Sequence, residues 1–450
     1  MTENPIIWQP DGERLKQTAM YRFMSMRSFD CYDDLYRWSI DQPAEFWQSF
    51  CDFCDVRFGK PADEILVQPG DMTTATWFSG AELSFAEHLL RHRGARAALV
   101  FCGENGARRE LSFDELRQAV AGIAEALRSA GVVKGDRVVG YLPNCPEAIV
   151  AMLATSSIGA IWSSCSPDFG INGVVDRFGQ IRPKVLFCAD GYFYNGKRHD
   201  SLDAVKGVLD IIDSIERTVV TSFASSDFAI DDIRGAVRWE DFAKQGATLE
   251  CTQVEFDHPL YIMYSSGTTG IPKCIVHGVG GTLLQHLKEH VLHLDIGTRD
   301  RLFYFTTCGW MMWNWLVSGL ASGATIMLYD GSPFFDDGRV LWKMAEAERL
   351  TVFGTSAKYI SALEKAGLRP KDEFDLAALR AIASTGSPLA PESFDFVYDA
   401  IADDIQLSSI SGGTDIISCF AAGNPILPVR RGELQCLALG MAVEIFNDEG

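Results

Sequence analysis

Short apolar runs alternate with amphipathic segments of helical period along most of the chain. Strands separated by helices are joined by crossover connections, so they pair in parallel and both faces of their sheet are covered. The alternation therefore predicts an α/β fold with largely parallel sheets. The strand candidates are residues 97–102, 137–142, 184–190, 260–265, 301–306, 325–330, 350–355, 379–385 and 405–411.

Local signals mark the ends of two helices and set the end of the chain apart. Ser112 with Glu115 three residues later predicts a capping box, Gly131 predicts the end of that helix, and Pro146 opens the next one. Residues 431–437 and 441–448 are strand candidates joined by a short turn with no helix between them. They predict a small antiparallel β piece.

The first 90 residues are rich in aromatic side chains and are predicted to be irregular or helical, with one helix over residues 43–53. Cys51 and Cys54 form a C-x-x-C pair, but no second pair or nearby histidine completes a zinc site. We expect two small buried residues on a helix. A chain of 450 residues exceeds one compact core, so two or three domains or subdomains are expected.

The amino-acid composition limits which binding partners and which cellular compartment are expected for the protein. A formal charge of −20 argues against a nucleic-acid surface, and an anionic ligand would need local neutralisation. Twelve cysteines without framework spacing fit reduced thiols. We find no signal peptide and no run of the roughly 20 apolar residues that a membrane span needs. A cytoplasmic protein without nucleic-acid partner or membrane span is expected.

The stretch YIMYSSGTTGIPK, residues 261–273, begins as a buried strand and becomes a polar, glycine-rich loop. Ligands of open α/β sheets bind beyond the carboxyl ends of the strands, where this loop lies. Its glycines let the backbone approach a ligand, and its hydroxyls, N–H groups and lysine suit phosphate oxygens. The loop is predicted to bind phosphate; the alternative is a polar hairpin loop. The candidates are Ser265, Ser266, Gly267, Thr268, Thr269, Gly270 and Lys273.

This loop resembles the phosphate loop of the adenylate-forming superfamily, although Cys274 stands where glycine is usual. ISGGTD (410–415) and STGSPLAP (384–391) resemble two further motifs of that superfamily. The resemblance implies two stacked αβαβα subdomains and a site for ATP. It implies that Thr414 contacts the α-phosphate, that Lys273 assists catalysis, and that Asp415, in place of the usual glutamate, holds Mg²⁺, if need be through a water. The other implied ATP contacts are Gly386, Ser387, Pro388, Ser409, Ile410, Ser411, Gly412 and Gly413.

YDDLYRWSIDQPAEFWQSF, residues 32–50, resembles the N-terminal segment of short-chain acyl-CoA synthetases, above all those that activate acetoacetate. The implied division is an N-terminal segment, 1–95, and an AMP-binding large domain, 96–450. Gly412, followed by Gly413, stands where acetate-activating relatives carry a tryptophan, so the acyl pocket is expected to admit a four-carbon keto acid. Trp310, Met311 and Met312 are expected to line its other side; the alternative for them is core packing.

The resemblance also implies the reaction. An acid attacks ATP to give an acyl adenylate and pyrophosphate, and the thiol of CoA then displaces AMP. Positioning and charge neutralisation carry such a transfer, so no nucleophilic triad is expected and His277 is expected to be structural. Lys197 and Arg198, in residues 194–200, are the candidate CoA-binding residues; the alternative is a solvated charged loop.

Superfamily members continue past the point that corresponds to Gly450, with a small catalytic C-terminal domain. We therefore expect residues 1–450 to be the large domain of an acid–CoA ligase that is poorly active alone. Another short- or branched-chain acyl-CoA synthetase is an alternative. So is a non-catalytic nucleotide- or acyl-binding module, if Gly450 is the natural end. A domain that loads a carrier protein is disfavoured by the N-terminal segment.

Overall fold

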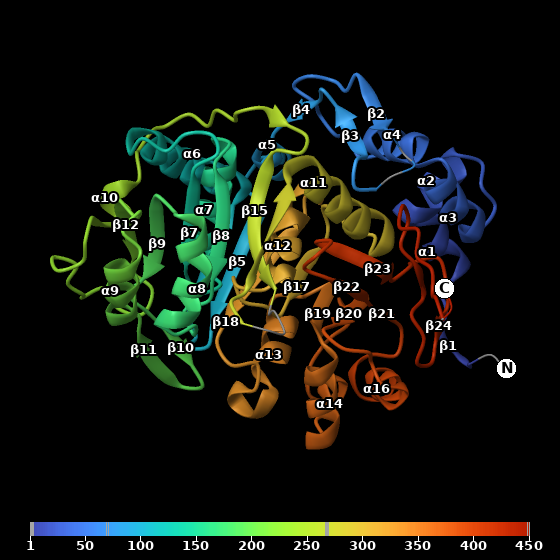
Figure 1. The fold of residues 1–450 in the computed structure, drawn as a ribbon. Coiled ribbons are helices and arrows are strands. Elements are labelled where there is room, and N and C mark those ends of the chain that lie inside the picture. The colour runs from blue at the N-terminus through green and yellow to red at the C-terminus, as the bar shows by residue number, and fades with distance from the viewer. Residues whose placement is uncertain (1–3, 69, 71, 266–269, 448, 450) are drawn as a thin grey trace.

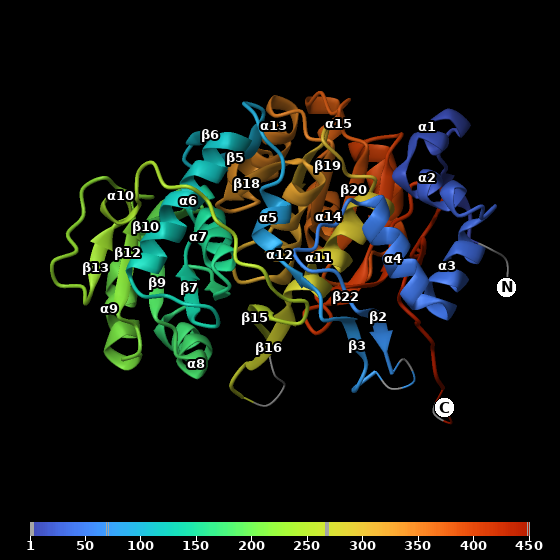
Figure 2. The same ribbon diagram turned by 90° about the horizontal axis from the view of Figure 1, so that it is seen from above.

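The computed structural model describes residues 4–68, 70, 72–265, 270–447 and 449. In these residues the chain forms two seven-stranded sheets, with helices between them and on both outer faces (Figure 1). Figure 2 shows the same layers from above. This arrangement confirms the predicted α/β class with two stacked, largely parallel layers.

The first sheet is parallel except for its last pair, β15 and β16. Helices α8 (Ile171–Ile181) and α9 (Leu202–Ile211) cover its outer face through a cluster that includes Val174, Phe178 and Val205. The strand order is β13 (Ala236–Arg238), β12 (Arg217–Thr221), β9 (Val185–Ala189), β7 (Arg137–Tyr141), β8 (Ile161–Cys165), β15 (Pro259–Ser265) and β16 (Lys273–Gly278).

The second sheet is also parallel except for its last pair, β5 and β6. Helices α13 (Val340–Ala347), α14 (Ala357–Ala366) and α16 (Pro391–Phe396) pack on its outer face. The strand order is β21 (Gln406–Ser409), β20 (Ala381–Thr385), β19 (Val352–Ser356), β17 (Arg301–Tyr304), β18 (Thr325–Asp330), β5 (Ala97–Gly103) and β6 (Arg108–Ser112).

The order of the strands along the chain does not follow their division between the two sheets. The hairpin β5–β6 comes before the first sheet in the sequence but belongs to the second, where Leu99 lies opposite Ile326. The hairpin β15–β16 follows most of the first sheet and completes its edge. The sequence pattern located these strands without indicating this division.

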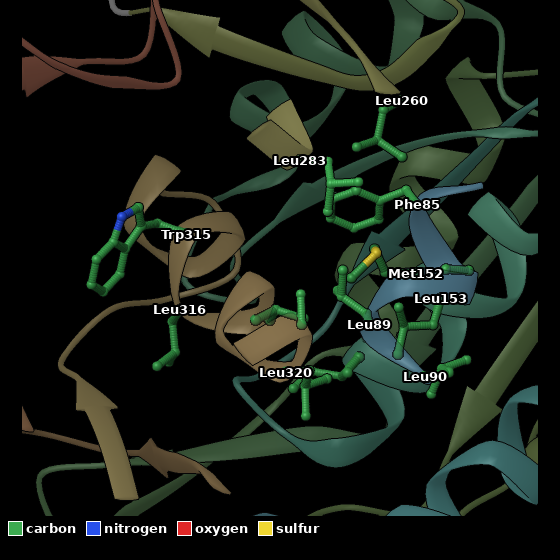
Figure 3. Close-up of a cluster of buried hydrophobic side chains, with 14 of the residues drawn as sticks. Phe85, Leu89, Leu90, Met152, Leu153, Leu260, Leu283, Trp315, Leu316 and Leu320 are labelled. Atoms are coloured by element: carbon green, nitrogen blue, oxygen red, sulfur yellow. The ribbon is translucent and has the colours of Figure 1, made fainter. Parts of the chain in front are cut away.

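The layer between the sheets forms most of the hydrophobic core (Figure 3). Helix α7 (Pro146–Ser157) is apolar all round and all its residues except Glu147 are buried, as expected for a helix covered on every side. Met152 of α7, Phe85 of α5 (Phe85–Leu89) and Leu283 of α11 lie together there. The other helical elements of the layer are α6 (Phe113–Ser129), α11 (Val279–Leu287), α12 (Met311–Ser318) and η2 (Gly319–Ser322).

Helix α6 follows its predicted signals. The Ser112 hydroxyl accepts a hydrogen bond from the Glu115 N–H at 3.2 Å, and the Glu115 carboxylate accepts one from the Ser112 N–H at 2.8 Å. This is the capping box, and Gly131 lies beyond the helix with a φ of 78°. The core face consists of Leu116, Val120, Ile123 and Leu127, all buried at helical spacing.

The N-terminal segment packs beside the end of the chain (Figure 1). β1 (Ile6–Trp8) pairs with β24 (Val429–Arg430), and the Tyr36 hydroxyl donates to the carbonyl of Met441 at 2.9 Å. The segment consists of β1, α1 (Gly12–Gln17), α2 (Ala19–Met26), α3 (Tyr32–Asp41), α4 (Pro43–Phe53), β2 (Glu64–Val67), β3 (Thr76–Ser79) and β4 (Glu82–Leu83).

Helix α4 spans the predicted residues, and the expectation for the C-x-x-C pair is confirmed. Cys51 lies on α4, Cys54 caps it, and both are buried. Within the described part of the chain no cluster of side chains suits a metal ion, and no helix is long and apolar enough to cross a membrane.

The small antiparallel β piece predicted near the C-terminal end is confirmed, but its predicted strand pairing is wrong. The sheet consists of β22 (Ser411–Gly413), β23 (Ser418–Ala422) and β25 (Cys436–Leu437), and only β25 lies within a predicted strand, residues 431–437. Residues 441–447 form no strand, and residue 448 lies outside the described residues. The backbone there bonds to the N-terminal helices instead: the Gly440 N–H donates to the Ser39 hydroxyl at 2.9 Å. Ile445 is 96% exposed, so no partner sheet covers this segment.

The remaining elements are short. They are β10 (Gly191–Tyr194), β11 (Lys197–Asp200), α10 (Trp239–Phe242), β14 (Val254–Glu255), the π-helical turn η1 (Lys288–His293), η3 (Phe335–Gly338), α15 (Pro370–Glu373) and η4 (Val397–Ile401).

Candidate functional site

Two adjoining cavities open at the carboxyl ends of strands β20 and β21. Their volumes are about 190 and 310 Å³, and they share Thr385, Gly386, Ile410 and Gly412 as lining residues. This is the edge where ligands of open α/β sheets bind. We refer to them as the apolar cavity and the polar cavity.

The polar cavity joins two stretches that the sequence analysis selected separately. Gly386 turns the chain after β20 with a φ of 90°, a conformation that suits glycine. The Thr385 hydroxyl donates to the carbonyl of Ile410 at 3.1 Å, which holds the turn against the end of β21. The predicted residues that line this cavity are Gly386, Ser387, Pro388, Ser409, Ile410, Ser411 and Gly412; Thr385, Leu389, Gly432, Glu433 and Leu434 line it without having been predicted.

The apolar cavity gathers the residues that were predicted to contact an acyl group. Trp310, Met311 and Met312 come from the start of α12, and Gly412 and Gly413 come from β22. Trp310 is 66% exposed, so its indole lies at the rim rather than in the core. Thr414 also lines this cavity, beside the boundary with the polar one.

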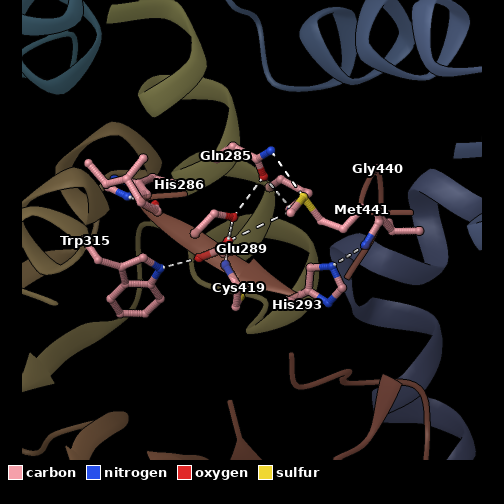
Figure 4. Close-up of polar contacts among 12 residues, drawn as sticks. Gln285, His286, Glu289, His293, Trp315, Cys419, Gly440 and Met441 are labelled. Atoms are coloured by element: carbon pink, nitrogen blue, oxygen red, sulfur yellow. Dashed lines mark hydrogen bonds and ion pairs between the residues drawn. The ribbon is translucent and has the colours of Figure 1, made fainter. Parts of the chain in front are cut away.

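The inner end of the apolar cavity is polar, which the sequence analysis missed (Figure 4). Glu289 is only 4% exposed, and its carboxylate accepts the indole N–H of Trp315 at 2.8 Å and the backbone N–H of Cys419 at 3.0 Å. The Ser418 hydroxyl donates to the same carboxylate. These residues line the cavity together with Met312. The available signal was the charged pair Lys288–Glu289 inside an otherwise apolar helical segment.

The groups behind Glu289 are buried and mostly uncharged. Burial lowers the pKa of the Lys288 ammonium, which donates to the Gln285 side chain at 2.7 Å and lies 4.0 Å from the Glu289 carboxylate. Burial also lowers the pKa of His286 to about 4 and that of His293 to about 3, so both rings are neutral at pH 7.

Gly412 has a structural role besides lining both cavities. A Cβ there would lie inside contact distance of the Ser418 carbonyl oxygen and 2.7 Å from the Cα of Cys419, because β22 and β23 pair closely at this point. No atom of the residues that the structure describes lies within 4 Å of a Cβ placed on Gly413. A side chain at position 412 would therefore require the backbone of Ser418 and Cys419 to shift.

The predicted phosphate loop is only partly described: Ser266, Gly267, Thr268 and Thr269 lie outside the described residues. Ser265 ends β15 opposite Lys273, the first residue of β16, so the loop closes an antiparallel hairpin. Gly270 has a φ of 139°. The Lys273 side chain is exposed and makes no ion pair with any residue that the structure describes.

The same hairpin is tied to the Thr414 motif. His277 of β16 donates from its Nε2 to the carbonyl of Thr414 at 2.7 Å, and burial lowers the pKa of this histidine. A neutral imidazole that positions two loops agrees with the structural role expected for His277. Asp415 follows Thr414 and is exposed.

Mg²⁺ is commonly held by one or two carboxylates together with substrate phosphates. The described residues contain no cluster of three metal-ligating side chains. Asp415, next to Thr414 and exposed, fits a site in which a nucleotide supplies most of the ligands.

Lys197 and Arg198 lie apart from the two cavities and line neither of them. They begin β11 after a two-residue turn at Asn195 and Gly196, whose φ values of 52° and 75° suit a tight hairpin. The buried carboxylate of Glu104 fixes this turn by accepting the N–H of Asn195 at 2.8 Å and that of Gly196. The Arg198 guanidinium lies 3.7 Å from the buried carboxylate of Asp190.

Comparison with known proteins identifies the class to which this fold and site belong. The sequence profile described as "AMP-binding enzyme" matches residues 85–450, and the profile "Acetyl-coenzyme A synthetase N-terminus" matches residues 32–89. The chain belongs to the AMP-binding enzyme family.

Within this family, the chain is similar to proteins that are named acetoacetyl-CoA synthetases. An acetoacetyl-coenzyme A synthetase of Rhizobium meliloti is 51% identical over all of this chain and 70% of its own length. The acetoacetyl-CoA synthetase of Gallus gallus is 46% identical over all of this chain and 69% of its own length. The solved structure of acetoacetyl-CoA synthetase from Streptomyces lividans superposes with a TM-score of 0.94 at 44% identity, over 99% of this chain and 70% of that one. These matches confirm the resemblance to adenylate-forming enzymes that was read from the sequence.

Proposed function

We propose that this chain is the nucleotide- and acyl-binding large domain of an ATP-dependent acid–CoA ligase that activates acetoacetate. The observation that carries the proposal is the similarity of the whole of this chain to about 70% of the length of acetoacetyl-CoA synthetases. The pair of joined cavities, one polar and one apolar, supports it, because an acyl adenylate needs both environments side by side.

In the first step, a carboxylate oxygen of acetoacetate attacks the α-phosphorus of ATP and pyrophosphate leaves. The polar cavity holds the adenine against Gly386, Ser387 and Pro388, while Thr414 contacts the α-phosphate between the two cavities. Lys273 and the loop of residues 265–270 bind the outer phosphates. Charge neutralisation and positioning then supply most of the rate enhancement.

Asp415 holds Mg²⁺ together with the triphosphate in this proposal. The metal neutralises phosphate charge when it is bound. Asp415 has a shorter side chain than glutamate, so a bridging water fits its reach.

In the second step, the thiol sulfur of CoA attacks the acyl carbonyl carbon and AMP leaves. Lys197 and Arg198 meet phosphates of CoA through the turn that Glu104 fixes. A small C-terminal domain of the same polypeptide closes the site and completes it. In this division residues 1–95 are the N-terminal segment and residues 96–450 the AMP-binding domain. The cytoplasm is the compartment, in keeping with twelve free cysteines.

The test is a substrate panel on a full-length polypeptide that carries this chain. Acetate, propionate, butyrate and acetoacetate are compared by pyrophosphate release and CoA-thioester formation. We expect acetoacetate to have the highest kcat/KM. A preference for another acid would overturn the substrate, and ATP binding without turnover would favour a non-catalytic module.

Malonamate is a second candidate substrate. A malonamoyl-CoA synthetase of Penicillium aethiopicum is 40% identical over 99% of this chain and 66% of its own length. Malonamate replaces the methyl group of acetoacetate by an amide nitrogen, so it has the same shape. It belongs in the panel for that reason.

A further inference from the structure

An acidic side chain, that of Glu289, lies at the inner end of the apolar cavity. Glu289 reaches the cavity wall from η1, and three donors converge on its carboxylate: the indole N–H of Trp315, the N–H of Cys419 and the hydroxyl of Ser418 (Figure 4). In all three of these hydrogen bonds the carboxylate is the acceptor. Since Trp315 and the Cys419 backbone belong to packed elements, the carboxylate cannot turn away from the cavity.

The groups around the Glu289 carboxylate would cancel its negative charge only in part. Lys288 is the one cation whose ion pair with Glu289 is recorded among the described residues, at 4.0 Å, and Lys288 does not line the cavity. His286 and His293 are neutral, and Gln285 carries no charge. A ligand group at the inner end of the cavity therefore meets the carboxylate before it meets the ammonium.

We propose that Glu289 is a specificity-determining residue that admits acids with an uncharged far end and rejects acids of the same size that carry a second carboxylate. The inference rests on the proposed function, because it assigns the acyl group to the apolar cavity. Two like charges in a site shielded from water repel strongly, whereas a methyl ketone or an amide does not.

Three acids separate charge from shape. Acetoacetate, malonamate and malonate share one skeleton and differ at the far end by a methyl group, an amide and a carboxylate. A pocket that selects by size alone would treat them alike. We expect kcat/KM for acetoacetate and malonamate to exceed that for malonate by at least about tenfold in the wild-type, full-length enzyme.

Substitutions at position 289 test whether Glu289 causes the discrimination against malonate. Glu289→Gln and Glu289→Met remove the charge, whereas the control Glu289→Asp keeps it; all three disturb the hydrogen bonds to Trp315 and Ser418. We expect the uncharged variants to raise the malonate-to-acetoacetate ratio of kcat/KM by about tenfold, and the Asp variant to leave it within about threefold. Two uncharged variants are used so that the result does not depend on the folding of one, and thermal melting verifies each.

The outcomes distinguish the inference from the function on which it rests. Failure of the wild-type enzyme to use acetoacetate would overturn the proposed function. Use of acetoacetate with equal use of malonate would overturn the role of Glu289 alone. So would a ratio that shifts equally in the Asp variant and in the uncharged variants, because it would then follow the hydrogen bonds and not the charge.

Discussion

Gly412 and Gly413 are neighbours in β22 that face different surroundings. The close pairing of β22 with β23 leaves no room for a side chain at 412 unless the backbone moves, whereas no described atom lies near a Cβ at position 413. The sequence interpretation gave both glycines one purpose, room for an acyl group. The structure shows that the first is also required by the backbone.

This difference predicts unequal effects of alanine. Gly412→Ala forces the Ser418 carbonyl and Cys419 to move, and we expect a loss of about 1–3 kcal/mol in the free energy of unfolding. Gly413→Ala meets no atom of the described residues and is expected to change stability by less than about 0.5 kcal/mol. Urea unfolding of the two variants is the measurement. Equal losses would mean that the strand pairing tolerates a methyl group.

Lys273 provides a second prediction at this scale, which tests the phosphate loop. Lys273→Ala is expected to weaken MgATP binding by about 1.5–3 kcal/mol, the worth of a charge-assisted contact, while adenosine binding stays the same. Calorimetry with both ligands measures the difference. Lys365→Ala is the matched control, because Lys365 is also exposed and lines neither cavity. Equal weakening of MgATP and adenosine would exclude Lys273 from a phosphate contact.

At the scale of elements, helix α6 illustrates what local signals determine. Its capping box, its buried spacing and its terminal glycine are all interactions between residues near in sequence. We expect Ser112→Ala to cost about 1 kcal/mol of stability, because the cap satisfies an otherwise unpaired N–H. Thermal melting measures this loss. Ser129→Ala, at the last residue of the same helix and without a recorded side-chain hydrogen bond, is the control.

Elements with such local signals were predictable, and elements defined by distant contacts were not. Helix α4, β18 and the helix at Pro146 lie where the sequence placed them, within a few residues. The segment after Gly440 looks like a strand by composition, but its backbone bonds to α3, which no local pattern indicates. For the site, motif resemblance selected two stretches, 384–391 and 410–415, and residues of both line the two adjoining cavities. It omitted Glu289, since a carboxylate inside a buried helical turn belongs to no motif that we used.

At the scale of the whole molecule, one buried junction links the two sheets. Asp330, at the end of β18, accepts the N–H of Asn144 at 2.9 Å, and Asn144 follows β7 of the other sheet. The Asn144 side chain donates to the carbonyl of Tyr329 at 3.3 Å and accepts the indole N–H of Trp313 at 3.0 Å. Burial is the main cause that raises the pKa of Asp330 to about 7; the hydrogen bond from the Asn144 N–H opposes this shift, and the nearby Asp168 and Glu104 add to it.

This raised pKa predicts how stability depends on pH. Between about pH 4 and 7 the folded protein keeps a proton on Asp330 that the unfolded chain has released. The contribution of Asp330 to stability therefore falls as the pH rises through that window. Asp330→Asn keeps an oxygen acceptor for Asn144 and removes the titration. We expect the wild type to lose about 2–3 kcal/mol relative to Asp330→Asn between pH 5 and 8, measured by urea unfolding. Parallel pH profiles would contradict the assignment.

The β5–β6 hairpin precedes the first sheet in the sequence but belongs to the second, and this has a consequence for biosynthesis. A nascent chain emerges from its N-terminus, so the hairpin of β5 and β6 leaves the ribosome long before β18, the strand with which β5 pairs. Until Thr325–Asp330 has been made, β5 presents an open edge that is a hazard for aggregation. The first sheet likewise stays incomplete until β15, residues Pro259–Ser265, has been synthesised. We therefore expect that neither half of the sequence folds completely on its own. Both sheets are completed late in synthesis, and the strand pairs that complete them join residues far apart in the sequence, which slows folding.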